Sequence, residues 1–399
     1  MIKLMKKAFT LLLLSALATG CKDIEQMLKT QKQKPTAVIT NYEYPNFPTE
    51  AAFTDTVDGK NVKLFTLTNA NGLKVALTNF GARVVGFWMP DANGKMTDIV
   101  LGLPDLKNYR LPAAKFFGSI AGRYCNRIAK GTFDLDGVKY QLDLNNGPNS
   151  LHGGTNGFHS RVWEGTQQGE QQVVFSYLSV DGEEGYPGNM IIKVTYKLTD
   201  ANELYMEYAA TSDKRTVVNV TNHNFWNLNG EGNGTINDHE LTIAASRFTP
   251  VDSTLIPTGI TSVVGTPFDF MQAVTIGKRV ADTSSEQMRF GGGYDHNFVL
   301  DSTSKGSPVF AARVKGNKSG IVMDIYTTEP GIQFYGGNFM KGEQTLKSGA
   351  KDDYRTAFCL ETQHFPNSPN QLDFPSTVLE PNMKFVSVTM HRFSLEGAQ

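Results

Sequence analysis

Hydrophobic and polar residues alternate along several stretches of the chain, which is the pattern of antiparallel strands with one buried face. The clearest case is residues 192–198, where Ile, Val, Tyr and Leu occupy every second position and Lys or Thr lies between them. Residues 173–180 and 204–208 are short stretches rich in the β-branched and aromatic residues that favour strands. This region is therefore expected to form a sheet.

Two turn signals predict β-hairpins nearer the N-terminus. Residues 69–72 read Asn-Ala-Asn-Gly and residues 136–137 read Asp-Gly, and each lies between two strand-like stretches. Asp-Gly suits a two-residue hairpin loop because both positions accept a positive φ. Only a short helical piece is expected, between residues 275 and 288.

Strands at short spacing without intervening helices predict an all-β fold, a large antiparallel β-sandwich. No linker-like segment interrupts residues 50–395, so residues 48–399 are expected to form a single domain.

The N-terminus has the pattern of an export signal. Three lysines within residues 3–7 precede an apolar stretch, residues 8–18, that is too short to span a bilayer. Small residues then precede Cys21, as in a bacterial lipobox, in which the cysteine is lipidated. Residues 1–20 are therefore predicted to be a lipoprotein-type signal peptide. The alternative is an ordinary signal peptide in which Cys21 is incidental.

Residues 21–47 are rich in Lys, Gln, Thr and Pro and are predicted to be a solvated tether. Together with a lipidated Cys21, this tether would hold the domain at a membrane of the bacterial cell envelope, in the periplasm or at the outer membrane.

The charge bears on possible partners, and the cysteine positions bear on disulfide bonding. The formal net charge is -1, and no basic run suggests a nucleic-acid partner. Cys125 and Cys359 show no spacing signal for a disulfide and are expected to be two free, buried thiols.

The most unusual strand-like stretch is residues 216–228. It begins with β-branched residues and then turns polar, with Asn219, Thr221 and His223 on one face if the strand is regular. Buried polar groups cost free energy unless they are hydrogen-bonded, so His223 is either a satisfied core histidine or part of a polar pocket. Asn222 would lie on the opposite face, unless a bulge re-aims it, and would then have a structural role.

Two segments before this stretch also carry polar side chains in unusual surroundings. Asn126 and Arg127 lie inside an apolar run, where a guanidinium suits sugar hydroxyls or a carboxylate, although a structural salt bridge is the plainer interpretation. His152 lies in a loop rich in Gly and Pro, a setting that often carries function. His159 is expected at the surface.

Three further candidates follow in the C-terminal half. Asp295 comes after three glycines, Gln333 lies between aromatic residues, and Glu361 lies within an apolar segment. A buried carboxylate has a raised pKa unless a partner holds it ionised, which is the setting of a general base, or of a core Glu paired with Arg127 for stability. No His-x-x-x-His or Cys-x-x-Cys spacing is present, so no metal site is predicted.

Taken in order, these motifs resemble the aldose 1-epimerase, or galactose mutarotase, family. They are residues 126–128 (Asn-Arg-Ile), 151–154 (Leu-His-Gly-Gly), 221–223 (Thr-Asn-His), 294–296 (Tyr-Asp-His), 330–335 (Pro-Gly-Ile-Gln-Phe-Tyr) and the Glu361 segment. The resemblance spans about residue 53 to the C-terminus. Cys125, where Ala is common, and Phe225-Trp226, where Tyr-Phe is frequent, are minor departures.

The resemblance implies a galactose mutarotase-like supersandwich that interconverts the α and β anomers of free aldohexoses such as glucose and galactose, without a cofactor. It implies that Glu361 is the general base and His223 the general acid. Five residues are implied to bind or support the sugar: Asn126, Arg127, His152, Asp295 and Gln333. Trp226 or Phe334 would suit stacking on a sugar face, or equally core packing.

Three alternatives stay open from the sequence. A glycoside hydrolase would use Asp295 and Glu361 as its carboxylate pair. Epimerisation of a phosphorylated hexose would need extra basic residues, and none stand out. A lipid-anchored sugar-binding protein would bind without turnover. The preferred aldose and the oligomeric state are not predicted.

Overall fold

The structure is a computed structural model that describes residues 42–304 and 306–396. The predicted signal peptide, Cys21 and most of the predicted tether lie outside the described residues. Within these residues, no helix is long and apolar enough to cross a membrane.

The last residues of the predicted tether belong to the folded unit, which includes residues 42–47. The Phe47 ring lies 4.7 Å from that of Trp88, and Trp88 Nε1 donates a 2.8 Å hydrogen bond to Pro45 O. Tyr44 Oη donates to Gly72 O at 2.8 Å. These aromatic side chains pack against the domain. They are irregularly spaced in the sequence, so periodicity alone does not predict their packing.

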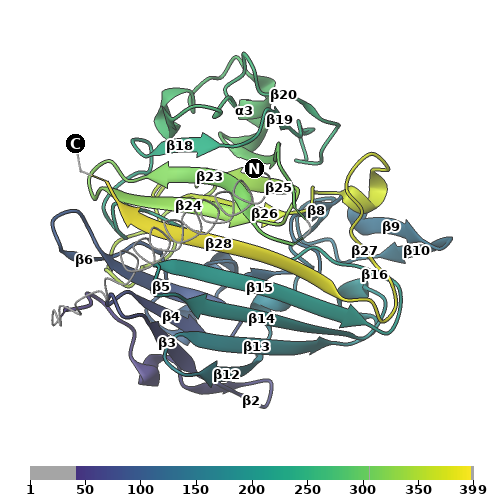
Figure 1. Cartoon of the computed structure of the whole chain (residues 1–399). Helices are drawn as coiled ribbons and strands as arrows, with labels where there is room; N and C mark the ends of the chain where they lie inside the picture. The colour runs from purple at the N-terminus through teal and green to yellow at the C-terminus, as the bar shows by residue number, and fades with distance from the viewer. Residues whose placement is uncertain (1–41, 305, 397–399) are drawn as a thin grey trace, which may run out of the picture. The chain divides into compact units, whose positions relative to one another are not determined.

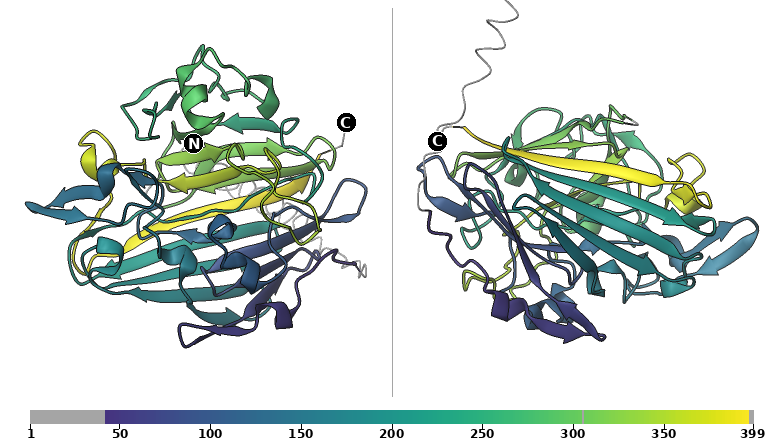
Figure 2. Two further views of the ribbon diagram at one scale, coloured as in Figure 1. Left: turned by 180° about the vertical axis from the view of Figure 1, so that it is seen from behind. Right: turned by 60° about the horizontal axis from the view of Figure 1, so that its bottom comes forward.

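A nine-stranded antiparallel sheet crosses the molecule (Figure 1). In spatial order its strands are β12 (Glu164–Gln168), β13 (Gln172–Ser179), β14 (Met190–Leu198), β15 (Glu203–Ser212), β28 (Phe385–Leu395), β24 (Ile321–Thr327), β23 (Val309–Lys315), β18 (Glu240–Ile243) and β21 (Val274–Thr275). The C-terminal strand β28 thus lies between β15 and β24, and Figure 2 shows it in yellow from two further directions.

Two smaller antiparallel sheets accompany it. The four-stranded sheet contains β3 (Leu64–Thr68), β4 (Lys74–Thr78), β5 (Arg83–Pro90) and β6 (Met96–Asp98). The five-stranded sheet contains, in spatial order, β20 (Thr261–Ser262), β19 (Arg247–Phe248), β22 (Asp295–Val299), β25 (Gly331–Tyr335) and β26 (Cys359–Gln363).

Short strand pairs and single-turn helices complete the described residues. The pairs are β1 (Asp55–Val57) with β2 (Lys60–Val62), β9 (Thr132–Leu135) with β10 (Val138–Gln141), β8 (Arg127–Ile128) with β11 (Ser150–Leu151), β16 (Thr216–Val217) with β27 (Val378–Leu379), and β7 (Ile120–Ala121) with β17 (Thr221–Asn222). The helices are η1 (Glu50–Phe53), α2 (Leu106–Tyr109), η2 (Pro112–Ala114), η3 (Ala129–Gly131), η4 (Phe158–Ser160), η5 (Glu183–Gly185), η6 (Ile276–Lys278), α3 (Glu286–Gly291) and η7 (Ser368–Asn370).

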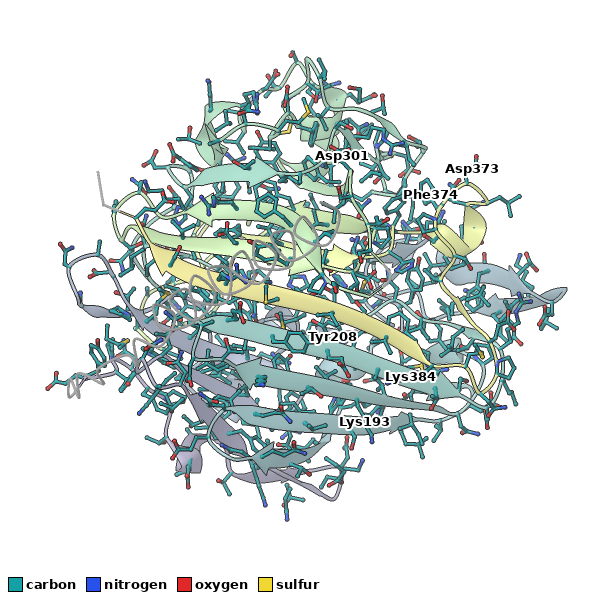
Figure 3. The ribbon with its side chains drawn as sticks, viewed as in Figure 1. Lys193, Tyr208, Asp301, Asp373, Phe374 and Lys384 are labelled. Carbon is teal, nitrogen blue, oxygen red and sulfur yellow. The ribbon has the colours of Figure 1, made fainter. Side chains whose placement is uncertain are left out.

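The alternation read from the sequence corresponds to the two faces of the large sheet. In β14 every second side chain is buried, and Lys193 between them is exposed, whereas Tyr208 on the neighbouring β15 is buried (Figure 3). One apolar core is shared by the buried faces of all three larger sheets, with contributions such as Val194, Phe87 and Phe334. The all-β sandwich prediction is therefore confirmed.

The local predictions also agree with the structure. Asp136 and Gly137 have φ values of 56° and 76° in the β9–β10 hairpin, as a two-residue loop of this kind requires. Residues 69–72 connect β3 and β4, and η6 and α3 lie close to the expected helical piece. Cys125 and Cys359 are free and buried.

Candidate functional site

One face of the five-stranded sheet carries a cluster of polar side chains. Gln333 on β25 pairs with Glu361 on β26, and Asn297 on β22 pairs with Gln333, so these three lie in one row. Asp295, two residues before Asn297, therefore points to the same face. The alternate positions Phe298, Phe334 and Leu360 point into the apolar core on the other face. The sheet pleat thus holds Asp295 and Glu361 on one rigid surface.

The segment that carries His223 is not one regular strand. It consists of the short strands β16 and β17, which pair with different partners, and His223 follows directly after β17. Its N–H donates to Ser119 O at 2.8 Å, and its carbonyl accepts from Gly118 N at 2.9 Å. Asn222 has the structural role that was one alternative, because its Nδ2 donates to Gly118 O and Tyr196 Oη.

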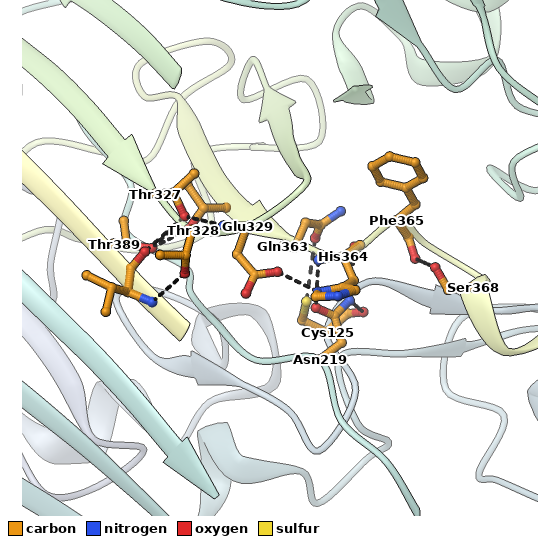
Figure 4. Close-up of polar contacts among 12 residues, drawn as sticks. Cys125, Asn219, Thr327, Thr328, Glu329, Gln363, His364, Phe365, Ser368 and Thr389 are labelled. Atoms are coloured by element: carbon orange, nitrogen blue, oxygen red, sulfur yellow. Dashed lines mark hydrogen bonds and ion pairs between the residues drawn. The ribbon is translucent and has the colours of Figure 1, made fainter. Parts of the chain in front are cut away.

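A polar network joins this segment to β26 (Figure 4). Asn219 Oδ1 accepts from His364 N, and Asn219 Nδ2 donates to His364 O, both at 3.0 Å. The His364 ring pairs with buried Glu329 at 2.6 Å, and Cys125 Sγ lies 3.5 Å from Gln363 Oε1. The two hydrogen bonds of Asn219 tie the strand that carries Glu361 to the segment that carries His223.

Two residues in left-handed conformation bring the third segment into the site. Asn126 has a φ of 60° and His152 a φ of 51°. The His152 N–H donates to Asn126 O, and the Asn126 N–H donates to His152 Nδ1, both at 3.1 Å. Because Nδ1 accepts this bond, Nε2 carries the proton of the neutral ring, so His152 is a hydrogen-bond donor from Nε2.

Arg127 and Asp295 form the charged side of the site. Arg127 Nη2 lies 3.7 Å from Asp295 Oδ2, and Arg127 Nε donates to Asn146 Oδ1 at 3.0 Å. Both charged residues are buried. Arg127 therefore pairs with Asp295, and not with Glu361 as the purely structural interpretation required.

These segments enclose a pocket of about 660 Å³. Six of the seven predicted catalytic or binding residues line it: Asn126, Arg127, His152, His223, Asp295 and Glu361. Gln333 lies behind Asp295 and donates to its Oδ1 at 2.7 Å, so it supports a lining residue. The pocket volume falls within the range of small-molecule sites, about 300 to 1,000 Å³.

His223 and Glu361 face each other in this pocket. His223 Nε2 lies 3.6 Å from Glu361 Oε1, and both side chains are almost fully buried. Glu361 Oε2 is buried and has no hydrogen-bond partner among the described residues. On the other side of the imidazole, Nδ1 lies 3.5 Å from Cys359 Sγ.

Burial sets the protonation of this pair. Burial raises the pKa of Glu361 well above its ordinary value, and Asp295 raises it further, whereas Arg127 lowers it. Burial lowers the pKa of His223 to about 4. Both shifts favour the uncharged forms, with the proton on Glu361 and a neutral His223. Desolvation disfavours the charged form of each group and so opposes the attraction between an ionised Glu361 and a protonated His223.

His152, His223 and Glu361 each offer one possible metal-ligand atom, and these atoms lie within 4.8 Å of one another, close enough to hold one metal ion. The sequence did not reveal this cluster because its members come from three distant segments. The hydrogen bond from Asn126 N to His152 Nδ1 leaves the other ring nitrogen protonated, and a metal ligand needs a free lone pair there. The cluster as it stands suits proton transfer and hydrogen-bond donation.

The aromatic residues of the pocket are not the ones the sequence suggested. Trp226 and Phe334 are fully buried in the core, and Trp226 packs against Phe87. Six aromatic residues line the pocket instead: Phe116, Phe117, Phe225, Phe290, Tyr335 and Phe339. An aromatic residue beside a polar motif was a weak signal for Phe225 and Tyr335, and none was available for the others.

The prediction that His159 lies at the surface is wrong. It is 2% exposed and packs edge-on against Phe116, with ring centroids 4.9 Å apart. Its carbonyl accepts from buried Arg83, which also donates to the carbonyl of Phe117 at 2.7 Å. Arg83 thereby holds the loop that presents Phe116 and Phe117 to the pocket.

A buried ion cluster anchors a further segment of the pocket wall. Lys347 Nζ lies 2.8 Å from Glu231 Oε2 and 3.3 Å from Asp98 Oδ2, and its side chain is 1% exposed. Glu231 Oε1 accepts from Ser348 N at 2.6 Å. The cluster secures the 340–352 segment, from which Met340, Lys341, Glu343 and Asp352 line the pocket.

Comparisons with known proteins bear on this geometry. The family model for aldose 1-epimerase matches residues 63–391. The galactose mutarotase of Sus scrofa is 44% identical over 349 residues, which cover 87% of this chain and 98% of that protein. The aldose 1-epimerase of Escherichia coli (strain K12) is 37% identical over 343 residues, which cover 85% of this chain and 97% of that protein.

Solved structures agree in fold. An aldose epimerase homologue from C. elegans has a TM-score of 0.76 at 32% identity and covers 84% of this chain and 100% of its own. A galactose 1-epimerase from Lactobacillus acidophilus NCFM has a TM-score of 0.74 at 27% identity and covers 86% of this chain and 97% of its own.

Proposed function

This chain belongs to the aldose 1-epimerase family and interconverts the α and β anomers of aldohexoses, and we propose that Glu361 and His223 carry the two proton transfers of that reaction. The observation that supports this assignment is the pair itself, with His223 Nε2 and Glu361 Oε1 3.6 Å apart in the wall of a buried pocket.

Ring opening needs one base and one acid. Glu361 removes the proton of the anomeric hydroxyl while His223 protonates the ring oxygen, so the C1–O5 bond breaks and the free aldehyde forms. Rotation about C1–C2 then presents the other face of the carbonyl. Closure reverses the proton transfers, with His223 as base and Glu361 as acid, and returns both groups to their starting states. General acid–base catalysis of this kind contributes about 10²- to 10⁴-fold from each group.

The proton count of the pocket fits this cycle. Protonated Glu361 and neutral His223 together hold one transferable proton, and its transfer to Nε2 creates the carboxylate base and the imidazolium acid. Sugar hydroxyls that donate to the Glu361 carboxylate stabilise the ionised form. Substrate binding thereby favours the active protonation state.

The surrounding residues supply the binding contacts. Arg127, Asn126 and His152 offer hydrogen-bond donors, and Asp295 accepts from sugar hydroxyls. Gln333 acts through Asp295, whose carboxylate it orients.

Polarimetry on freshly dissolved α-glucose and α-galactose tests the activity of the purified domain. We expect the optical rotation to relax faster in proportion to enzyme concentration, while the final equilibrium ratio stays unchanged.

Relaxation at the buffer rate despite measurable sugar binding would instead identify a binding protein without turnover. Release of sugar from a glycoside, with no effect on free-sugar anomers, would identify a hydrolase. A preference for phosphorylated hexoses would identify an epimerase of phosphorylated hexoses.

We also propose that the mature chain is lipidated at Cys21 and anchored in the bacterial cell envelope. The support is the N-terminal pattern alone: lysines within residues 3–7, the short apolar stretch 8–18, and small residues before Cys21. A mutarotase at this location would meet sugars before or during their uptake.

Labelling of cells with a fatty-acid analogue tests the anchor. The full-length chain should incorporate the label and sediment with membranes, whereas Cys21→Ser should lose the label without a change in the activity of the domain. Soluble, unlabelled wild-type protein would rule out the anchor.

A further inference from the structure

The imidazole of His223 is held in its plane by aromatic side chains. It stacks on Phe225 at 5.0 Å with an angle of 23°, and on Phe116 at 5.8 Å with an angle of 17°. The His152 ring packs edge-on against it, with ring centroids 5.1 Å apart. Apolar stacking fixes the ring plane but does not distinguish the two ring nitrogens, because neither phenyl ring offers a hydrogen-bond partner.

The two nitrogens differ in their remaining neighbours. Nε2 lies 3.6 Å from Glu361 Oε1, and Nδ1 lies 3.5 Å from Cys359 Sγ. A neutral imidazole carries one proton, so one nitrogen donates and the other accepts. The acid–base cycle requires Nε2 to gain and lose a proton facing Glu361, so the neutral ring must keep its proton on Nδ1.

We propose that Cys359 is a positioning residue whose sulfur accepts the Nδ1–H of His223 and thereby leaves Nε2 free for the proton exchange with Glu361. This role rests on the proposed function of His223. A ligand or catalytic histidine commonly donates its second N–H to a fixed acceptor, and that contact sets the tautomer.

A neutral sulfur is suited to this position. Burial raises the pKa of Cys359 well above its ordinary value, with Glu361 and Asp295 adding to the effect, so the group stays an uncharged thiol. An uncharged acceptor orients the imidazole without stabilising its charged form, as a carboxylate would. The imidazolium of His223 therefore stays a strong acid toward a weakly basic ring oxygen.

The strand pairing places the sulfur where the role requires it. Cys359 and Glu361 are two residues apart on β26, so both point to the pocket face of the sheet. One strand thus supplies the group on each side of the imidazole, and the spacing between them is set by the pleat.

The test compares Cys359→Ala, Cys359→Ser and Cys125→Ala. Nitrogen-15 NMR of the histidine rings reports the tautomer of His223, and polarimetry gives kcat and KM. Cys125 is the matched control, because it is also a free, buried thiol but lies against Gln363 and not against His223.

We expect wild type, Cys359→Ser and Cys125→Ala to show the Nδ1–H tautomer. Cys359→Ala should shift the ring toward Nε2–H and lower kcat about 2- to 10-fold, the size of one neutral hydrogen bond, with KM unchanged. An unchanged tautomer in Cys359→Ala would overturn the proposal, as would a Cys359→Ser variant no better than Cys359→Ala. The tautomer measured by NMR does not depend on turnover. A failure of the proposed function would therefore appear only in the polarimetry.

Discussion

Replacing Glu361 with glutamine should lower kcat/KM for mutarotation by about 10²- to 10⁴-fold while the protein stays folded. Glutamine has nearly the same shape, but its amide cannot take the proton of the anomeric hydroxyl. The carboxyl of Glu361 lines the pocket with Oε1 3.6 Å from His223 Nε2, so the substitution removes the proposed base from its place beside the acid. Polarimetry on α-galactose measures the change.

The controls separate chemistry from folding. Glu329→Gln alters a carboxyl group that is equally buried but lies outside the pocket, against His364, and it should keep most of the activity. His223→Gln should lose activity to a similar extent. Because Glu361 and His223 share one proton, the double variant should be much less impaired than the product of the single losses predicts. Wild-type turnover by Glu361→Gln would disprove the assignment of the base without affecting the family.

Replacing Lys347 with methionine should lower the free energy of unfolding by about 3–5 kcal/mol, the usual cost of removing one partner from a buried ion cluster. The change leaves the carboxylates of Asp98 and Glu231 buried without their cation. It also removes the Lys347 Nζ hydrogen bond to Val100 O, which is 3.0 Å long. Denaturant unfolding followed by fluorescence measures the change.

The loss should depend on pH. Burial raises the pKa of Asp98 to about 7, although Lys347 lowers it, so without Lys347 it should rise further. Folded wild type takes up this proton only as the pH falls through 7, whereas the folded variant already holds it at higher pH, so the stability deficit of the variant should shrink as the pH falls from about 9 toward 7. A difference that is constant over this range would contradict the electrostatic explanation.

Lys214→Met is the matched control for this change. Lys214 also pairs with a carboxylate, Asp181, but its side chain is 57% exposed. Solvent screens an exposed ion pair, so the control should be close to wild type in stability across the same pH range.

Local features of the fold were predictable because they depend on neighbours in the chain. The Asp136-Gly137 turn forms as expected, since its φ values are set by the two residues themselves. The alternation in residues 190–198 corresponds to the buried and exposed faces of β14, because the side-chain period of a strand is fixed by its backbone. The insertion of β28 between β15 and β24 was not predictable, since pairing between distant strands leaves no local signal.

For the site, the sequence alone determined the candidate chemistry. Four polar residues lie within apolar runs of the sequence: Asn126, Arg127, His223 and Glu361. Burial of a polar group without a hydrogen-bond partner costs free energy, so these positions could be recognised as candidate site residues. Their order also revealed the family.

Only the tertiary structure decided which groups meet and in which protonation state. It placed Gln333 behind Asp295 and Trp226 and Phe334 in the core, and it buried Glu361 so that its pKa is raised. The physical reason is that sequence records the type of each side chain, whereas desolvation and hydrogen bonding depend on neighbours contributed by distant strands. His223 illustrates the contributions of sequence and fold. Its surroundings in the sequence indicated that it needs polar partners, and the fold places Glu361 near Nε2 and Cys359 near Nδ1.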